Sequence, residues 1–222
     1  MKRVERLGEA KSPDGTTLTL YRHDGAYLIR ADGVELMSTR RHKSEDALAE
    51  IVCAPLRARS DVRVLIGGLG LGFTLRAALA SLASDARVVV AEIVKGVITW
   101  NRNPAFAISA DILADPRVDL RLADVADVLR ANPGEFDAIM LDVDNGADPL
   151  TTAGNAQLYG LAGIRTAVAA LRPHGSIAWW SAQSDPVFEK ALRSVGLTVD
   201  VLNVHAHGSS GSQHTLLVAQ AS

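Results

Sequence analysis

Two carboxylates, an amide and a glycine follow an apolar run in the middle of the chain. Residues 139–146 read IMLDVDNG, which places Asp142, Asp144 and Asn145 directly after a segment that could be a buried strand. Carboxylates at a strand end can bind a metal ion, remove a proton or hold a charged substrate. They can also do no more than begin a turn. The predicted strands and helices around this segment indicate which of these roles fits.

A glycine-rich bend lies further towards the N-terminus. Residues 65–75 read LIGGLGLGFTL, in which Gly68, Gly70 and Gly72 alternate with leucine between a predicted strand and a predicted helix. Glycines let the backbone pass close to a ligand, and a helix N-terminus offers unpaired N–H groups. The spacing departs from the G-x-G-x-x-G pattern of dinucleotide sites. A tight strand-to-helix connection is therefore the alternative interpretation.

Acidic residues mark the ends of the next two predicted strands. Glu92 ends RVVVAE, and Asp124 comes shortly after VDLRLA. An acid at the first position can accept hydrogen bonds from ribose hydroxyls, and a side chain at the second can reach an adenine amino group. Because the carboxyl ends of consecutive parallel strands meet at one edge of a sheet, this pattern predicts a nucleoside site.

Strand and helix patterns alternate from Asp61 onward, which predicts an α/β fold with a doubly wound, mainly parallel sheet and helices on both faces. Segments 197–204 and 214–219 close the chain as two strands. Since only the loop 205–213 separates them, they should pair antiparallel.

The first part of the chain has a different pattern. Segments 16–23 and 26–32 flank Asp24 and Gly25, a strong hairpin signal, and segment 34–39 is a plausible third strand. We therefore expect a small antiparallel β-hairpin module over residues 1–43 and a nucleoside-binding domain over residues 44–222. Ser44 is expected to cap the first helix of the second part.

Composition excludes several classes of function. A chain of 222 residues with 48% hydrophobic residues can build one sizeable domain, and its net charge of −2 is a poor match for nucleic-acid binding. Cys53 is the single cysteine, so an internal disulfide and a cysteine zinc cluster are excluded, and we expect it to be a buried small hydrophobic residue. With no apolar signal region and no membrane-spanning run, a reducing cytoplasm is the expected location.

Five features occur in order along the chain: the glycine loop, Glu92, the DPRV before the third strand, Asp124 and the strand end at Asp142. Together they resemble the class I S-adenosylmethionine-dependent transferases, and among them the spermidine synthase family. The resemblance covers nearly the whole chain, the hairpin module and the final strand pair included. It implies a Rossmann-like, seven-stranded sheet and a homodimer. It also implies that the loop from Gly68 to Gly72 packs against the amino-acid or aminopropyl end of S-adenosylmethionine or its decarboxylated form, that Glu92 holds the ribose and that Asp124 holds the adenine.

Asp142 matches the aspartate that faces the amine acceptor in this family. A carboxylate there can orient the amine and accept its proton, and no metal is needed. The chain departs from the family after this residue: Asn145 stands where a second aspartate is expected, and Asp144 lies one position too early. Gly70 replaces an aspartate of the glycine loop, and residues 47–49 lack the Tyr-His-Glu of the first helix. The resemblance therefore supports the cofactor-binding half of the family's site better than its polyamine-binding half.

Two further groups could serve a different acceptor. In AWWSAQSD, strand alternation lets only one of Trp179 and Trp180 face the site, and we predict Trp180, with Gln183, as acceptor-binding residues. Packing in the core is the alternative. The three histidines of HAHGSSGSQH could suggest a metal site or a base above the pocket, but a surface loop is the favoured interpretation. These are His205, His207 and His214.

The leading hypothesis is a transferase that uses S-adenosylmethionine or decarboxylated S-adenosylmethionine to modify a small nucleophilic acceptor, an amine if the family is followed. A methyltransferase acting on a non-polyamine substrate is the alternative that the missing amine-binding groups favour. A non-catalytic nucleoside-binding protein is a third, although the retained Asp142 argues against it. Balanced charge does not encourage an RNA-modifying transferase. No metal, nucleic-acid or membrane partner is expected.

Overall fold

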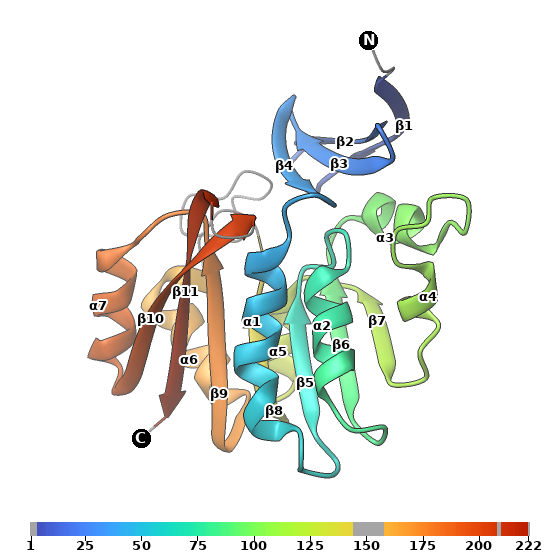
Figure 1. Cartoon of the computed structure of the whole chain (residues 1–222). Coiled ribbons are helices and arrows are strands. Elements are labelled where there is room, and N and C mark those ends of the chain that lie inside the picture. Colours follow the sequence, from blue (N-terminus) through green and yellow to red (C-terminus); the bar gives the residue numbers. More distant parts are fainter. Residues whose placement is uncertain (1–3, 144–157, 208–209, 222) are drawn as a thin grey trace.

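The computed structural model describes residues 4–143, 158–207 and 210–221, and within these ranges the chain forms two sheets (Figure 1). The N-terminal sheet has the order β1-β2-β3-β4, and the large sheet has the order β10-β11-β9-β8-β5-β6-β7. The N-terminal sheet consists of β1 (Val4–Lys11), β2 (Thr17–His23), β3 (Ala26–Ala31) and β4 (Val34–Ser38). The large sheet consists of β5 (Arg63–Gly67), β6 (Arg87–Glu92), β7 (Val118–Leu122), β8 (Phe136–Leu141), β9 (Leu171–Ser181), β10 (Leu197–His207) and β11 (Ser210–Ala221).

The turns of the N-terminal sheet follow from their residue types. Asp24 and Gly25 both have positive φ, 52° and 75°, as the tight turn between two antiparallel strands requires. Asp32 and Gly33 repeat this arrangement between β3 and β4. The predicted hairpin is thus confirmed. Strand β1 was not predicted, because its sequence VERLGEAK is mostly polar and its strand pairing depends on β2.

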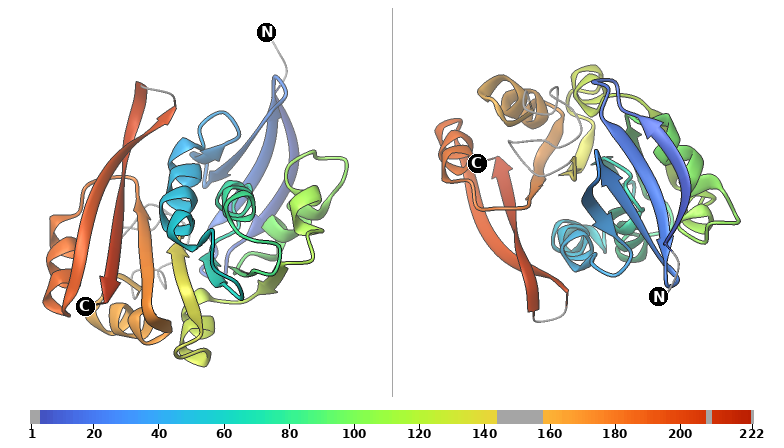
Figure 2. Two further views of the ribbon diagram at one scale, coloured as in Figure 1. Left: turned by 60° about the horizontal axis from the view of Figure 1, so that its bottom comes forward. Right: turned by 90° about the horizontal axis from the view of Figure 1, so that it is seen from above.

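The large sheet is parallel except for β11, which pairs antiparallel with both β9 and β10. The predicted doubly wound, mainly parallel sheet and its antiparallel end are confirmed. Every residue of β8 is buried, which explains its uninterrupted apolar sequence apart from Asp137. Seen from above, the N-terminal sheet lies over strands β5 to β7 of the large sheet, and strands β10 and β11 lie at the opposite end of that sheet (Figure 2).

Helices cover both faces of the large sheet. Apolar side chains of α1 and α2 pack in one core cluster, and those of α5, α6 and α7 pack in another. Figure 1 shows α1 and α2 in front of the sheet and α5 and α6 behind it. The bounds are α1 (Lys43–Cys53), the short 3₁₀ helix η1 (Ala54–Leu56), α2 (Phe73–Ser81), α3 (Lys95–Arg102), α4 (Ala110–Leu113), α5 (Val125–Ala131), α6 (Leu161–Ala169) and α7 (Pro186–Ser194).

Some local predictions are confirmed. Asp185 caps α7 by accepting a hydrogen bond from the Phe188 amide at 2.9 Å, and Pro186 is the first helical residue. Cys53 is fully buried, and burial raises the pKa of its thiol to about 12. None of the helices in the described ranges is long and apolar enough to cross a membrane.

Other local predictions are wrong. The segment 205–213 was expected to be a loop, but β10 runs to His207 and β11 begins at Ser210. The pattern AGIRTAVAALRP predicts a helix that Pro173 helps to end, but α6 ends at Ala169 and Pro173 lies in β9. Ser44 does not cap α1: the helix begins at Lys43, and the Ser44 hydroxyl bonds to other side chains. The division into units 1–43 and 44–222 stays a prediction.

Candidate active site

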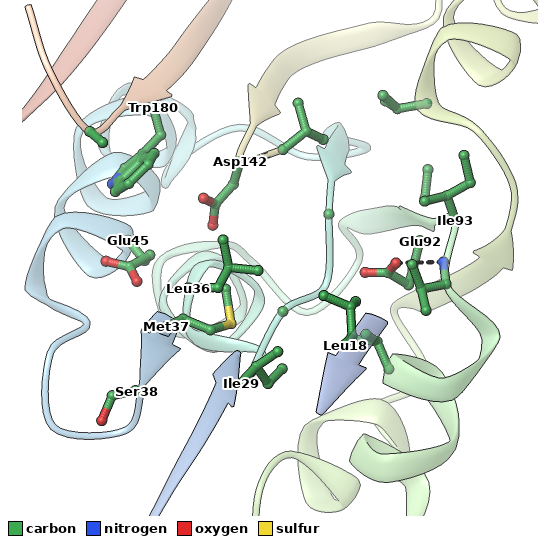
Figure 3. Close-up of a pocket in the computed structure, with 18 of the residues that line it drawn as sticks. Leu18, Ile29, Leu36, Met37, Ser38, Glu45, Glu92, Ile93, Asp142 and Trp180 are labelled. Atoms are coloured by element: carbon green, nitrogen blue, oxygen red, sulfur yellow. Dashed lines mark hydrogen bonds between the residues drawn. The ribbon is translucent and has the colours of Figure 1, made fainter. Parts of the chain in front are cut away.

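A cavity of about 260 Å³ lies at the carboxyl ends of the parallel strands, beneath the N-terminal sheet (Figure 3). This is the edge at which open α/β sheets bind ligands, and the volume is at the small end for ligand pockets. Several residues predicted for the site line this cavity, and they are Gly68, Gly70, Glu92, Asp124, Asp142 and Trp180.

Three predicted positions have a different outcome. Gln183 is exposed beyond the end of β9 and is not among the residues that line the cavity, so its role as an acceptor-binding residue stays a prediction. Gly72 also lies outside the wall; it precedes α2 with φ 82°, and a Cβ there would lie 2.8 Å from Ser109 Cβ. For Gly72 the tight connection is therefore the correct interpretation. Asp144 and Asn145 lie outside the described residues.

Gly68 allows the end of β5 to approach the end of β8. It has φ 89°, and a Cβ at this position would lie 2.2 Å from the Asp142 carbonyl oxygen. The Asp142 amide in turn donates to the Gly67 carbonyl at 2.9 Å. Only glycine fits this approach, and the approach places the Asp142 side chain on the cavity wall.

Gly70 lies against the N-terminal sheet. A Cβ at this position would lie 2.5 Å from Met37 Cε and 2.8 Å from Met37 Sδ. The Gly70 carbonyl accepts a hydrogen bond from Asn101 Nδ2 of α3 at 2.8 Å, which holds the glycine loop in place. The space that a side chain at position 70 would need is thus filled by the Met37 thioether of β4.

Backbone amides orient the two acids of the predicted nucleoside half. Glu92 is buried and accepts hydrogen bonds from the Leu69 amide at 3.0 Å and from the Val94 amide at 2.7 Å. Asp124 caps α5 by accepting from the Ala126 amide at 2.8 Å. Both carboxylates are therefore held by main chain that the strand-to-helix connections supply.

Side chains hold the acids on the opposite side of the cavity. The Thr74 hydroxyl donates to Asp142 Oδ2 at 2.7 Å. Glu45, from the first turn of α1, is only 8% exposed and faces the same space as Asp142 (Figure 3). Burial and the neighbouring charge of Asp142 raise the pKa of Glu45 to about 7. Sequence reasoning missed Glu45, because an acid in a first helical turn is ordinary.

Ser44 and His214 extend this group. The Ser44 hydroxyl donates to the Glu45 carboxylate, and its oxygen lies 2.8 Å from His214 Nδ1. The His214 ring packs edge-on against Trp180, with centroids 4.6 Å apart. Burial and the positive charge of Arg41 lower the pKa of His214. Of the three clustered histidines, His214 lines the cavity.

The two tryptophans divide as strand alternation predicts. Trp180 lines the cavity, whereas Trp179 is fully buried on the other face, against Phe188 of α7. The N-terminal sheet adds an apolar wall that sequence reasoning did not predict, since apolar strand residues carry no chemical signal of their own. This wall is made of Leu18, Ile29, Leu36 and Met37 (Figure 3).

The charge of the cavity is strongly negative. Arg41 also lines it and forms an ion pair with Glu35, so one acid is compensated. The described part of the chain contains no cluster of three or more potential ligand side chains that could hold a metal ion. The acids that the described residues contribute to the wall are Glu35, Glu45, Glu92, Asp124 and Asp142.

Comparison with known proteins finds similarity in structure alone. No family model and no curated protein sequence matches the chain. A spermidine synthase solved in complex with the transition state analogue AdoDATO matches with a TM-score of 0.74 and 19% identity, over 98% of this chain and 73% of that one. Spermidine synthase from Thermotoga maritima matches with a TM-score of 0.72 and 20% identity over the same shares of the two chains.

A probable spermidine synthase from Corynebacterium glutamicum matches with a TM-score of 0.66 and 17% identity, over 96% of this chain and 79% of that one. The chain therefore has a spermidine synthase-like fold, as its sequence motifs predicted. At these identities the likeness extends to the fold and not to an activity.

Proposed function

We propose that this protein is a transferase that uses S-adenosylmethionine or its decarboxylated form to modify a small amine. The observation that carries the proposal is the pair of carboxylates, Asp142 and Glu45, in a negatively charged cavity at the carboxyl ends of the strands. Such a cavity attracts cations, and both an ammonium acceptor and a sulfonium cofactor are cations. The spermidine synthase-like fold supports the same reaction class.

The residues of the nucleoside half fit a nucleoside. A carboxylate has about four acceptor positions, so Glu92 can accept hydrogen bonds from ribose hydroxyls while two amides orient it. Asp124 reaches the same cavity from the adjacent strand end and would hold the adenine. When bound, the cofactor supplies an electrophilic carbon on a sulfonium sulfur.

Asp142 would hold and align the acceptor. Its carboxylate is fixed by Thr74, so the position of a bound amine nitrogen is fixed as well. Alignment of a nucleophile with its target can supply a large part of a rate enhancement. The Trp180 ring offers a face that can contact a cation, and the apolar wall of the N-terminal sheet limits water in the cavity.

The acids and the glycine loop favour different groups for transfer. A cavity rich in carboxylates repels the carboxylate of intact S-adenosylmethionine, which favours the decarboxylated cofactor and aminopropyl transfer. Methyl transfer is the second candidate, because Gly70 carries no acid and Met37 fills the space beside it. A preference for the decarboxylated cofactor would favour aminopropyl transfer, and a preference for intact S-adenosylmethionine would favour methyl transfer.

Calorimetric titration with S-adenosylmethionine, its decarboxylated form and methylthioadenosine tests the proposal, with Glu92→Gln as the matched control. We expect one of the two cofactors to bind, and Glu92→Gln to bind it more weakly. Mass spectrometry of a panel of mono- and diamines incubated with that cofactor then identifies the acceptor and the group moved. Absence of binding by all three compounds contradicts the proposal.

A further inference from the structure

Ser44 joins a buried carboxylate of the cavity to an imidazole nearer the surface. We propose that Glu45, Ser44 and His214 form a proton relay, in which Glu45 takes the proton released by the acceptor amine and Ser44 passes it to His214. This inference rests on the proposed function and deepens it: Asp142 orients the acceptor, and a second carboxylate receives the proton.

The two carboxylates are held in different ways. Asp142 is fixed by the Thr74 hydroxyl at 2.7 Å and by the close approach of Gly68 to its carbonyl. Glu45 is bonded to Ser44, and through Ser44 it is connected to His214. A proton that reaches Glu45 therefore meets a hydroxyl in contact with a base.

The Ser44 hydroxyl has one hydrogen and two partners. When Glu45 is ionised, the hydroxyl donates to it; when Glu45 is protonated, Glu45 can donate to Ser44 Oγ, and the hydroxyl can turn to His214 Nδ1. Transfer of the Glu45 proton to Ser44 Oγ, as the Ser44 proton moves to Nδ1, leaves Glu45 ionised and His214 as imidazolium. The imidazolium then gives its Nε2 proton to solvent, which restores the starting charges. His214 is only partly buried, whereas Ser44 is fully buried.

The surrounding charges let Glu45 take up a proton near neutral pH. Glu45 faces Asp142 across the cavity and has Asp46 on its own helix, and both negative charges add to the effect of burial in raising the pKa of Glu45 to about 7. Glu35 lines the same cavity from β4, paired with Arg41.

On the other side of the relay, burial and Arg41 lower the pKa of His214, so the imidazole is neutral and able to accept a proton near neutral pH.

Steady-state kinetics of three variants test the relay. Glu45→Gln should lower kcat about 100-fold with cofactor affinity unchanged, and Ser44→Ala and His214→Ala should each lower it about 10-fold and shift the pH profile. Added imidazole should restore activity to His214→Ala and not to Ser44→Ala. The matched controls are Glu50→Gln, an exposed acid of α1, and His205→Gln on β10, neither of which lines the cavity. An unchanged kcat in Glu45→Gln, or a failure of imidazole rescue, overturns the relay.

A measurement without turnover keeps the relay testable if no acceptor reacts. Carbon NMR of the Glu45 carboxyl and nitrogen NMR of His214 should show the imidazole signals changing at the pH where Glu45 titrates, and Ser44→Ala should abolish that coupling. If Glu45 and His214 titrate independently in the wild-type protein, the relay is overturned, whatever the cofactor experiments show. Conversely, coupled titrations in a protein that binds no cofactor would sink the proposed function and leave the connection between the side chains standing.

Discussion

The two halves of the cavity are built in different ways. In the nucleoside half, Glu92 and Asp124 are held by backbone amides of the strand-to-helix connections that follow β5, β6 and β7. In the acceptor half, Asp142, Glu45 and His214 come from β8, α1 and β11, and they are held by side-chain hydroxyls.

This difference has a consequence for how each half can change. Any sequence that forms the strand-to-helix connections supplies the amides of the nucleoside half, so this half needs few specified side chains. In the acceptor half, Asp142, Glu45 and His214 are bonded to the side-chain hydroxyls of Thr74 and Ser44, and substitutions of such side chains can alter this half without altering the fold.

Replacement of Asp142 by asparagine should have the largest effect and would separate the halves most clearly. The variant keeps the shape of the side chain and loses its charge, so we expect kcat to fall by about 100- to 1,000-fold, in the range of general acid–base contributions. Nucleoside affinity should stay within about threefold, because no nucleoside contact is assigned to Asp142. Calorimetry and kinetics on the same preparation measure both quantities.

Thr74→Val is the companion variant, since it removes the hydroxyl that orients Asp142 and leaves the carboxylate in place. Its kcat should lie between those of the wild type and Asp142→Asn. If Asp142→Asn loses nucleoside affinity as strongly as turnover, the two halves are not independent and the comparison fails.

Glu45 should make the stability of the acceptor half depend on pH. Its pKa is raised from 4.5 to about 7, so the native protein keeps a proton that the unfolded chain has already released between these values. The free energy of unfolding must then fall as pH rises through that window, by about 3 kcal/mol in total. Glu45→Gln removes this loss and should be more stable than the wild type by about that amount at neutral to alkaline pH.

Urea unfolding at about pH 4 and about pH 8 measures the effect, at a protein concentration held constant. Glu50→Gln, on the exposed side of the same helix, should show the same pH dependence as the wild type. A Glu45→Gln variant that gains no relative stability between the two pH values would contradict the burial of an ionisable Glu45.

The same contrast explains how much the sequence predicted. Glu92 and Asp124 were found because their place at strand ends is a local pattern, and the structure places both on the cavity wall. Glu45 could not be found in this way, because its approach to Asp142 depends on how α1 packs against the large sheet. No spacing along the chain encodes that packing.

The ends of β9 and β11 account for two further outcomes. Alternation placed Trp180 on the cavity correctly, but β9 ends at Ser181, so the pattern cannot be extended to Gln183. His214 was expected beside a surface loop because glycine and serine precede it, yet β11 begins at Ser210 and pairing with β10 holds that segment. At the start of β11, strand pairing thus overrode local propensity.

Glu92→Gln tests how strongly backbone amides hold the acid of the nucleoside half. The amide group keeps one oxygen and presents an NH₂ to an amide donor, so one of the hydrogen bonds from Leu69 and Val94 must be lost. We expect a loss of about 1.5–3 kcal/mol in unfolding free energy, the cost typical of a hydrogen bond to a charged group, and about a 10-fold loss in nucleoside affinity. Asp124→Asn is the control, since asparagine caps helices as well as aspartate and should leave stability nearly unchanged. Equal stability losses in both variants would show that the amides do not distinguish the two acids.

The smallest effect concerns the boundary between the glycine loop and the N-terminal sheet. Gly70 has φ 52°, and a Cβ there meets Met37 Cε at 2.5 Å, so Gly70→Ala should cost about 2 kcal/mol from backbone strain and crowding together. In a Met37→Ala background the crowding is gone and the strain remains, so the same substitution should cost about 1 kcal/mol. A double-mutant cycle by chemical denaturation measures the difference. Additive costs would mean that Met37 does not occupy the space beside Gly70, and the case for methyl transfer would lose its structural support. A coupling of the expected size would show that the N-terminal sheet, and not the loop alone, limits the space beside Gly70 in the cavity.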